Sequence, residues 1–242
     1  MAHILALGIQ SFVKLRQNAY FYVDKSRFIE DWWTGGYDVT LITRPRRFGK
    51  TLMLDTVRTF FAPECRKHAH LFEGLAIWNT THFRALQGAI PVIYLSFASV
   101  KSTTYATSLA LIKALLSRLY DDFEPTLDVS LLTDREKKQL ASVDMSMTEA
   151  IAQDSLLALC KYLARQNNVL PIILLDEYDT PLQEAWLNGY WDELAGFLRG
   201  LFNATFKSNP WLGRGLLTGI TRISKESIFS DVNNPALKGG AL

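Results

Sequence analysis

Short runs of aliphatic and β-branched residues alternate along the chain with longer segments whose apolar residues recur at helical spacing. The four strongest runs are Val39–Ile42, Ile90–Leu95, Val169–Leu175 and Gly215–Ile220. Continuous apolar runs of this length are typical of strands that are buried on both faces of a sheet. Because helical patterns separate them, the sequence predicts an α/β fold with a mainly parallel sheet.

The segments between and around these strands carry the predicted helices. They are Lys25–Trp33 with Asp24 as N-cap, Leu52–Phe61, Glu64–Phe72, Tyr105–Leu119, Met147–Gln166, a helix opening at Thr180, and Trp191–Phe206. Tyr20–Val23 is aromatic and β-branched, which favours a short strand. The more polar stretch 126–143 is expected to lie on the surface.

The strongest chemical signal lies between the first strand and its helix. This segment reads Thr43-Arg-Pro-Arg-Arg-Phe-Gly-Lys-Thr51, and the order strand, loop, Gly-Lys-Thr, helix is that of a phosphate-binding P-loop, or Walker A motif. Its backbone N–H groups and the helix dipole favour an anion. Lys50 is expected to reach the β- and γ-phosphates, and the Thr51 hydroxyl to bind Mg²⁺. The residues predicted to hold the nucleotide are Arg44, Pro45, Arg46, Arg47, Phe48, Gly49, Lys50 and Thr51.

The loop departs from the usual pattern, in which a glycine stands five positions before Gly49. That position holds Arg44, and Pro45 fixes its own φ and biases Arg44 away from the α region. The loop also carries four cationic side chains in a short span, and these repel one another unless an anion lies among them. An ordinary basic loop before a helix is the alternative interpretation.

A second motif supports the first. The apolar run Val169–Leu175 ends in Asp176 and Glu177, so a buried parallel strand delivers two carboxylates to its C-terminal end, where open α/β sheets bind ligands. Asp176 is expected to hold Mg²⁺, as in a Walker B motif, and Glu177 to orient and deprotonate the attacking water.

Three further groups have weaker signals. The fourth strand ends in Thr218-Gly-Ile-Thr-Arg222, so that Thr218 or Thr221 could sense a γ-phosphate and Arg222 could neutralise charge; a polar turn capped by Ser224 is the alternative. Tyr20 and Tyr22 could flank an adenine.

Asp179 could support a magnesium ion from a distance. A helix cap at Pro181 is favoured for this residue.

Composition sets the remaining limits. The chain has 242 residues, a net charge of +2 and 48% hydrophobic residues. This length is enough for one α/β domain, and the small net charge gives no reason to expect nucleic-acid binding. We expect one domain over residues 1–234, with 1–37 as an N-terminal appendage and 235–242 as a tail. No membrane span or signal peptide is expected, and two cysteines make no disulfide framework, so a cytoplasmic location is the default.

Four segments in order resemble the AAA-ATPase-like family. They are Tyr20–Ser26, Arg44–Thr51, Leu175–Pro181 and Thr218–Arg222, and the resemblance runs from about Gly8 to about Asn234. It implies a P-loop NTPase fold, a three-layer αβα sandwich, with Mg²⁺ and ATP as ligands. It also implies that Arg44 is an accepted form of the loop in this family.

Members of this family usually continue into a nuclease-like domain of the PD-(D/E)XK type, which is absent here. The sequence is therefore expected to be a fragment, truncated before the last core strand. We predict Mg-dependent ATP binding and hydrolysis. The alternatives are a nucleotide-dependent switch with little turnover and the ATPase half of a nucleic-acid-processing protein, in which nucleic acid is bound by the full-length protein only. Homo-oligomerisation stays open.

Overall fold

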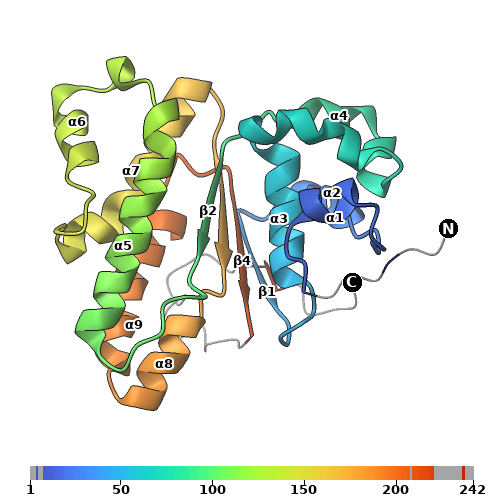
Figure 1. Ribbon diagram of the computed structural model, residues 1–242. Helices are drawn as coiled ribbons and strands as arrows, with labels where there is room; N and C mark the ends of the chain where they lie inside the picture. The colour runs from blue at the N-terminus through green and yellow to red at the C-terminus, as the bar shows by residue number, and fades with distance from the viewer. Residues whose placement is uncertain (1–3, 5–7, 208, 221–235, 238–242) are drawn as a thin grey trace.

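The computed structural model describes residues 4, 8–207, 209–220 and, through their backbone, 236–237. At its centre lies a parallel sheet in the order β2-β3-β4-β1-β5 (Figure 1). Its strands are β1 (Val39–Thr43), β2 (Val92–Ser96), β3 (Ile172–Asp176), β4 (Arg214–Gly219) and β5 (Ala236–Leu237). The α/β class and the parallel sheet that the sequence predicts are therefore confirmed.

Helices cover both faces of this sheet. In Figure 1, α1–α4 lie on one side of the strands and α5–α9 on the other. The helices are α1 (Phe12–Gln17), α2 (Arg27–Thr34), α3 (Lys50–Phe61), α4 (Thr81–Leu86), α5 (Tyr105–Phe123), α6 (Asp134–Ala141), α7 (Glu149–Asn167), α8 (Thr180–Asn188) and α9 (Trp191–Phe202). Segments of 3₁₀ helix span Pro63–Phe72, Ala76–Asn79, Glu124–Thr126 and Val129–Leu131, and a π-helical turn spans Asn203–Lys207.

The two-residue period of the strands divides the core into two clusters. On β3, Ile173 and Leu175 pack into the cluster formed with α5, α7, α8 and α9. The alternate residues Ile172 and Leu174 pack into the cluster formed with α1, α2 and α3. Because successive side chains of a strand point to opposite faces, one apolar run fills both layers.

The strand order brings the two motifs to one edge of the sheet. Strand β4 lies between β1 and β3, pairing Thr43 with Gly219 and Leu175 with Leu217. Since all these strands are parallel, their carboxyl ends meet along this edge. The loop after β1, the acids after β3 and the end of β4 are therefore neighbours.

The free edge of β1 is partly covered. Residues Ala236 and Leu237 form β5 and pair with Thr40 and Leu41. The sequence predicts four strands and no strand here, because two residues leave no recognisable apolar run.

The N-terminal segment differs from its prediction in two ways. Tyr20–Val23 is not a strand, and within the described residues the Phe21 N–H donates to the Ile4 carbonyl at 3.0 Å. Helix α2 begins at Arg27 after Ser26, so Asp24 is not its N-cap. The Asp24 carboxylate instead accepts hydrogen bonds from the backbone N–H groups of Ser26 and Ala76, both at 2.8 Å.

Residues expected to form an N-terminal appendage contribute to the second core cluster. Phe12 is fully buried and Trp32 is 1% exposed, and both pack with α3. The backbone N–H of Phe12 also donates a 2.6 Å hydrogen bond to the Asp55 carboxylate on α3. Burial raises the pKa of Asp55, and the Phe12 bond and the Arg58 charge oppose that rise.

Candidate functional site

The loop between β1 and α3 turns through two residues with left-handed backbone conformation. Arg47 has φ of +69° and Gly49, the N-cap of α3, has φ of +76°. Glycine adopts this conformation without penalty, whereas for another residue it costs about 1–2 kcal/mol. The loop is tied to the sheet where the Arg44 N–H donates to the Gly219 carbonyl at 3.1 Å.

Lys50 begins α3 and lies under this loop. It is 8% exposed, and its Nζ donates to the carbonyl oxygens of Arg44 at 2.8 Å and Pro45 at 3.0 Å. The buried ammonium is thereby fixed at the helix N-terminus, where the positive end of the helix dipole also lies.

Asp176 joins three elements at the end of β3. It is 2% exposed. The Thr51 hydroxyl of α3 donates to its Oδ2 at 2.7 Å, and the Thr218 hydroxyl of β4 donates to its Oδ1 at 2.5 Å. Two hydroxyl donors compensate for the loss of water around a buried carboxylate.

Glu177 follows Asp176 with a backbone φ of +52°. Its Oε2 accepts a hydrogen bond of 3.2 Å from the Thr180 hydroxyl. Its side chain lines the cavity in front of the loop. The left-handed conformation is uncommon outside glycine and costs about 1–3 kcal/mol, and residues held this way concentrate at functional sites.

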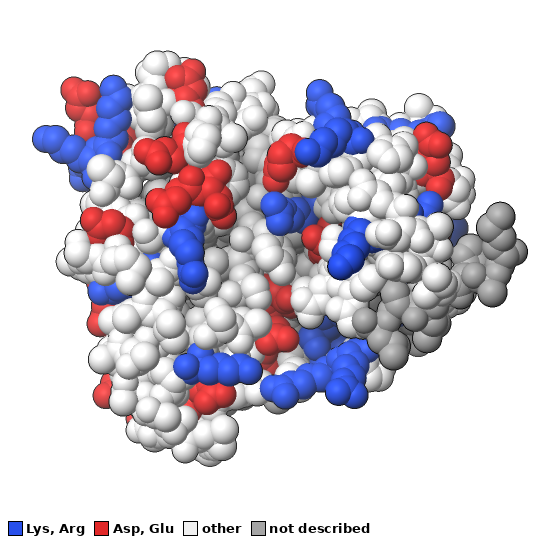
Figure 2. All heavy atoms as spheres, in the orientation of Figure 1, with Lys and Arg blue, Asp and Glu red and all other residues white. Residues whose placement is uncertain are grey.

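The cavity at this edge has a volume of about 810 Å³. Positive side chains gather beside it, and Figure 2 shows Lys and Arg side chains along the lower edge, where the β1–α3 loop lies in Figure 1. The lining residues are Gly8, Ile9, Gln10, Arg46, Arg47, Gly49, Lys50, Thr51, Leu52 and Glu177.

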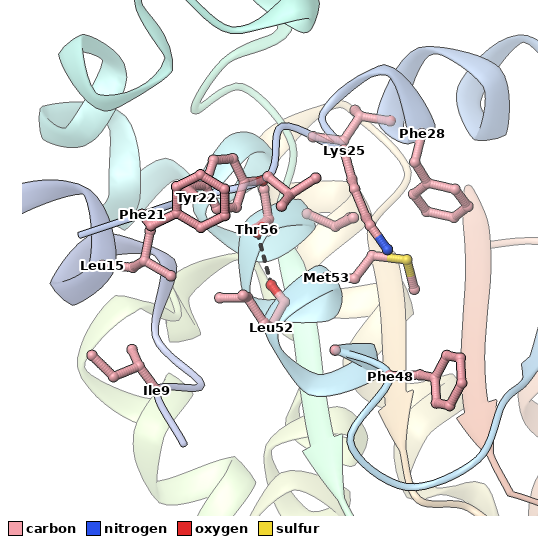
Figure 3. Close-up of a pocket in the computed structure, with 14 residues that line it drawn as sticks. Ile9, Leu15, Phe21, Tyr22, Lys25, Phe28, Phe48, Leu52, Met53 and Thr56 are labelled. Carbon is pink, nitrogen blue, oxygen red and sulfur yellow. Dashed lines mark hydrogen bonds between the residues drawn. The ribbon is translucent and has the colours of Figure 1, made fainter. Parts of the chain in front are cut away.

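An apolar pocket of about 240 Å³ adjoins this cavity, sharing Ile9, Gly49 and Leu52 with it. Figure 3 shows side chains from the N-terminal segment, the loop and α3 around it, with Tyr22 and Phe48 among them. Tyr22 was expected near a base and lies here.

Tyr20 was also expected near a base, but it is not among the residues that line the pocket. Burial raises the pKa of Tyr22, so its phenol stays protonated at neutral pH.

The other predicted residues fall into three groups. Arg44 and Pro45 contribute carbonyl oxygens, and Phe48 faces the apolar pocket with 62% of its surface exposed. The Thr218 hydroxyl donates a hydrogen bond to Asp176. Arg222 lies outside the described residues, as do Thr221 and Ser224.

Asp179 corrects a prediction. It occupies the position before α8, but its side chain makes no capping hydrogen bond to that helix. Its Oδ2 accepts from the Ile220 N–H and from Gln183 Nε2, both at 2.9 Å. The carboxylate therefore links the acidic turn to the end of β4.

Several site residues escaped the sequence prediction. Gly8–Gln10 reach the cavity from the far end of the chain, and Phe28 and Met53 line the apolar pocket. No spacing rule marks them, because their positions depend on how the N-terminal segment packs on α3. The Thr180 hydroxyl was also missed, although its place three residues after Glu177, at the start of a helix, was a usable signal.

Within the described part of the chain, no three histidine, cysteine, aspartate or glutamate residues gather as a metal-binding group. Among the same residues, no helix is both long enough and apolar enough to cross a membrane.

Fold and site define a parallel α/β protein with a basic strand–loop–helix cradle facing a buried aspartate and a partly buried glutamate. Residues 6–229 match the family described as "Predicted AAA-ATPase", and the chain belongs to this AAA-ATPase-like family. It is 30% identical over 237 residues to an "Uncharacterized protein in vnfD 5'region" from Azotobacter chroococcum mcd 1. The match covers 95% of this chain and 40% of that relative. No solved structure matches the chain.

Proposed function

We propose that this chain binds Mg-ATP in the cavity at the N-terminus of α3 and hydrolyses it. One observation carries the proposal: Lys50, Thr51 and Glu177 line one cavity, and Asp176 is hydrogen-bonded to Thr51 behind it. These four side chains come from two elements that the sequence separates by more than a hundred residues. An ordinary basic loop that binds no ligand would not account for Asp176 and Glu177 lying beside it.

The phosphates would bind at the loop. Arg46, Arg47 and Lys50 line the cavity, and a helix N-terminus adds N–H donors and positive potential. Charge-assisted hydrogen bonds of this kind are about twice as strong as neutral ones. A polyphosphate would also relieve the repulsion among the cationic side chains of the loop.

The oxygen donors fit a magnesium ion. Thr51 Oγ1 and Asp176 Oδ2 lie 2.7 Å apart, and hydroxyl and carboxylate oxygens are ligands that Mg²⁺ prefers. Thr51 would hold the ion directly and Asp176 directly or through water. When bound, the ion would neutralise charge on the β- and γ-phosphate oxygens.

The base would occupy the apolar pocket beside the cavity. Ligand pockets combine apolar walls with a few polar groups, and this one presents the Tyr22 ring and the Lys25 ammonium among aliphatic side chains. The pocket and the phosphate cavity share a wall, so one nucleotide would place its base in the pocket and its phosphates in the cavity.

Hydrolysis would use Glu177 as general base. The carboxylate would take a proton from water as the water oxygen attacks the γ-phosphorus and the bond to the β–γ bridging oxygen breaks, which releases ADP and phosphate. Thr218, held on Asp176, would lie near the γ-phosphate. Arg222 would neutralise developing charge.

The test is phosphate release by Glu177→Gln beside the unaltered chain. We expect Mg-ATP affinity to be retained and turnover to fall by about 10²–10⁴-fold, since only the base is lost. Glu124 is exposed at the C-cap of α5. Glu124→Gln is therefore the control and should match the unaltered chain. Undiminished turnover in Glu177→Gln would place the base elsewhere.

A further inference from the structure

The turn that follows β3 holds its backbone with several hydrogen bonds. The Tyr178 N–H donates to the Thr218 carbonyl at 3.1 Å, and the Thr180 N–H donates to the Glu177 carbonyl at 3.0 Å. Gly219 approaches so closely that a Cβ there would lie 2.7 Å from Tyr178 Cε1. The turn is therefore packed against β4 and is rigid around Glu177.

This rigidity maintains an unfavourable backbone conformation at Glu177, whose φ is +52°. A strained conformation persists only when its surroundings over-determine it. Here the strain directs one particular side chain, the carboxylate that lines the cavity.

That carboxylate has a partner of its own. Thr180 is 5% exposed, and its hydroxyl donates to Glu177 Oε2 at 3.2 Å. The bond occupies one oxygen, and among the described residues no donor is bonded to Oε1, whose lone pairs could accept from a water molecule. A general base needs both a fixed position and a free lone pair.

From this geometry we infer that Thr180 is the positioning residue for Glu177, holding the base by one oxygen so that the other accepts the proton of the attacking water. The inference rests on the proposed function. Thr180 is not among the residues that line the cavity, so it would act through Glu177.

The test compares Thr180→Val, which keeps the shape and removes the hydroxyl, with Thr180→Ser, which keeps the hydroxyl. For each we would measure kcat and KM for Mg-ATP at neutral pH beside the unaltered chain, with thermal melting as a check of folding.

In Thr180→Val we expect kcat to fall about three- to tenfold with KM unchanged, the value of one lost hydrogen bond. Thr180→Ser should restore kcat.

A merely structural Thr180 would lower the melting temperature and leave kcat unaltered in the folded Thr180→Val protein, and this result would overturn the inference. So would a Thr180→Ser variant with kcat as low as that of Thr180→Val, because the hydroxyl would then not matter. If Thr180→Val keeps its kcat while Glu177→Gln is inactive, the proposed function stands alone. Absence of Glu177-dependent hydrolysis in the unaltered chain would overturn the proposed function and the inference together.

Discussion

Asp176 shows how individual side chains create this site. A carboxylate that is 2% exposed would be costly to bury alone, by several kcal/mol. The hydroxyls of Thr51 and Thr218 satisfy one oxygen each. Thr51 Oγ1 and Asp176 Oδ2 stabilise the fold through their hydrogen bond, and they are also the oxygens that would hold a cation in the proposed site.

Tyr22 allows a test of the base pocket at the scale of one residue. We expect Tyr22→Ala to weaken ATP binding about tenfold or more, because base–aromatic contacts contribute about 1–3 kcal/mol per base. Binding of inorganic tripolyphosphate, which has no base, should be unchanged. Competition titration against a fluorescent nucleotide measures both affinities.

Tyr22→Phe is the matched control, since it keeps the ring and removes only the buried hydroxyl, and it should retain ATP affinity. An equal loss of ATP and tripolyphosphate affinity in Tyr22→Ala would show that the pocket shapes the loop instead of holding a base.

At the residue scale, spacing and chemistry predicted the placement of Lys50, Thr51, Asp176 and Thr218 along one edge of the sheet. Each belongs to a motif whose residue types and order are set by its chemistry, at the end of a strand or the start of a helix. The position of Thr180 three residues after Glu177 was readable, but its bond to Glu177 also depends on the left-handed backbone conformation of Glu177, which the residue type does not announce.

Among the elements, the strands were predicted best because burial on both faces gives them continuous apolar runs. Tyr20–Val23 has strand-forming residues but does not form a strand, and its Tyr22 packs instead against Phe12 of α1 and the core cluster around α3. Helix ends were less predictable. Asp24 satisfies the N–H groups of a turn and of a distant segment instead of capping α2, which a local rule cannot foresee.

Two threonines on neighbouring strands allow a matched stability test. Thr218 on β4 donates to Asp176, whereas Thr40 on β1 is equally buried and its hydroxyl has no hydrogen-bond partner within the described structure. We expect Thr218→Val to lower the free energy of unfolding by about 1–3 kcal/mol, because a buried carboxylate loses a donor.

Thr40→Val should be neutral or stabilising by up to about 1 kcal/mol, since a valine leaves no buried hydroxyl unpaired. Urea unfolding monitored by circular dichroism measures both. Equal losses in the two variants would mean that shape, and not the bond to Asp176, decides the effect.

On the scale of the whole molecule, one sheet organises two cores, and a surface excursion is clamped to one of them. The polar stretch 126–143 contains α6, whose Glu136 is 7% exposed. Glu136 Oε1 accepts 2.7 Å contacts from Lys161 Nζ and Arg165 Nη1 of α7. The excursion is thus held by these ion pairs as well as by Leu127, Leu132 and Val143, which are buried in the core cluster.

Glu136 predicts how stability changes in acid. The Lys161 ammonium, with the Thr133 backbone N–H, lowers the pKa of Glu136 to about 2, below the value of roughly 4.3 expected in the unfolded chain. A depressed folded-state pKa stabilises the fold above the unfolded value, and the contribution is lost as pH falls from about 4.5 toward 2. Glu136→Gln should remove this part of the pH dependence and be less stable at pH 7.

Asp134→Asn is the control, because its 3.8 Å contact with Lys137 is exposed and exposed pairs contribute about 0–1 kcal/mol. Unfolding free energies from pH 2.5 to 7 check both variants. A Glu136→Gln variant with an unaltered pH profile would contradict the clamp.

The chain spans about 40% of the length of its Azotobacter relative. The site supports a proposal for this chain only. What a whole protein of that length does, including contacts with nucleic acid or with further copies, is a separate proposal.

The most direct test of nucleotide binding at the β1–α3 loop is the Mg-ATP affinity of Lys50→Ala, measured by isothermal titration calorimetry beside the unaltered chain and the exposed-site control Lys101→Ala. We predict that Lys50→Ala lowers the Mg-ATP affinity about tenfold to hundredfold, because a charge-assisted contact to phosphate is removed. Lys101→Ala should leave the affinity unchanged. Affinity in Lys50→Ala equal to that of the unaltered chain would contradict the account, as would a folded unaltered chain that binds no Mg-ATP.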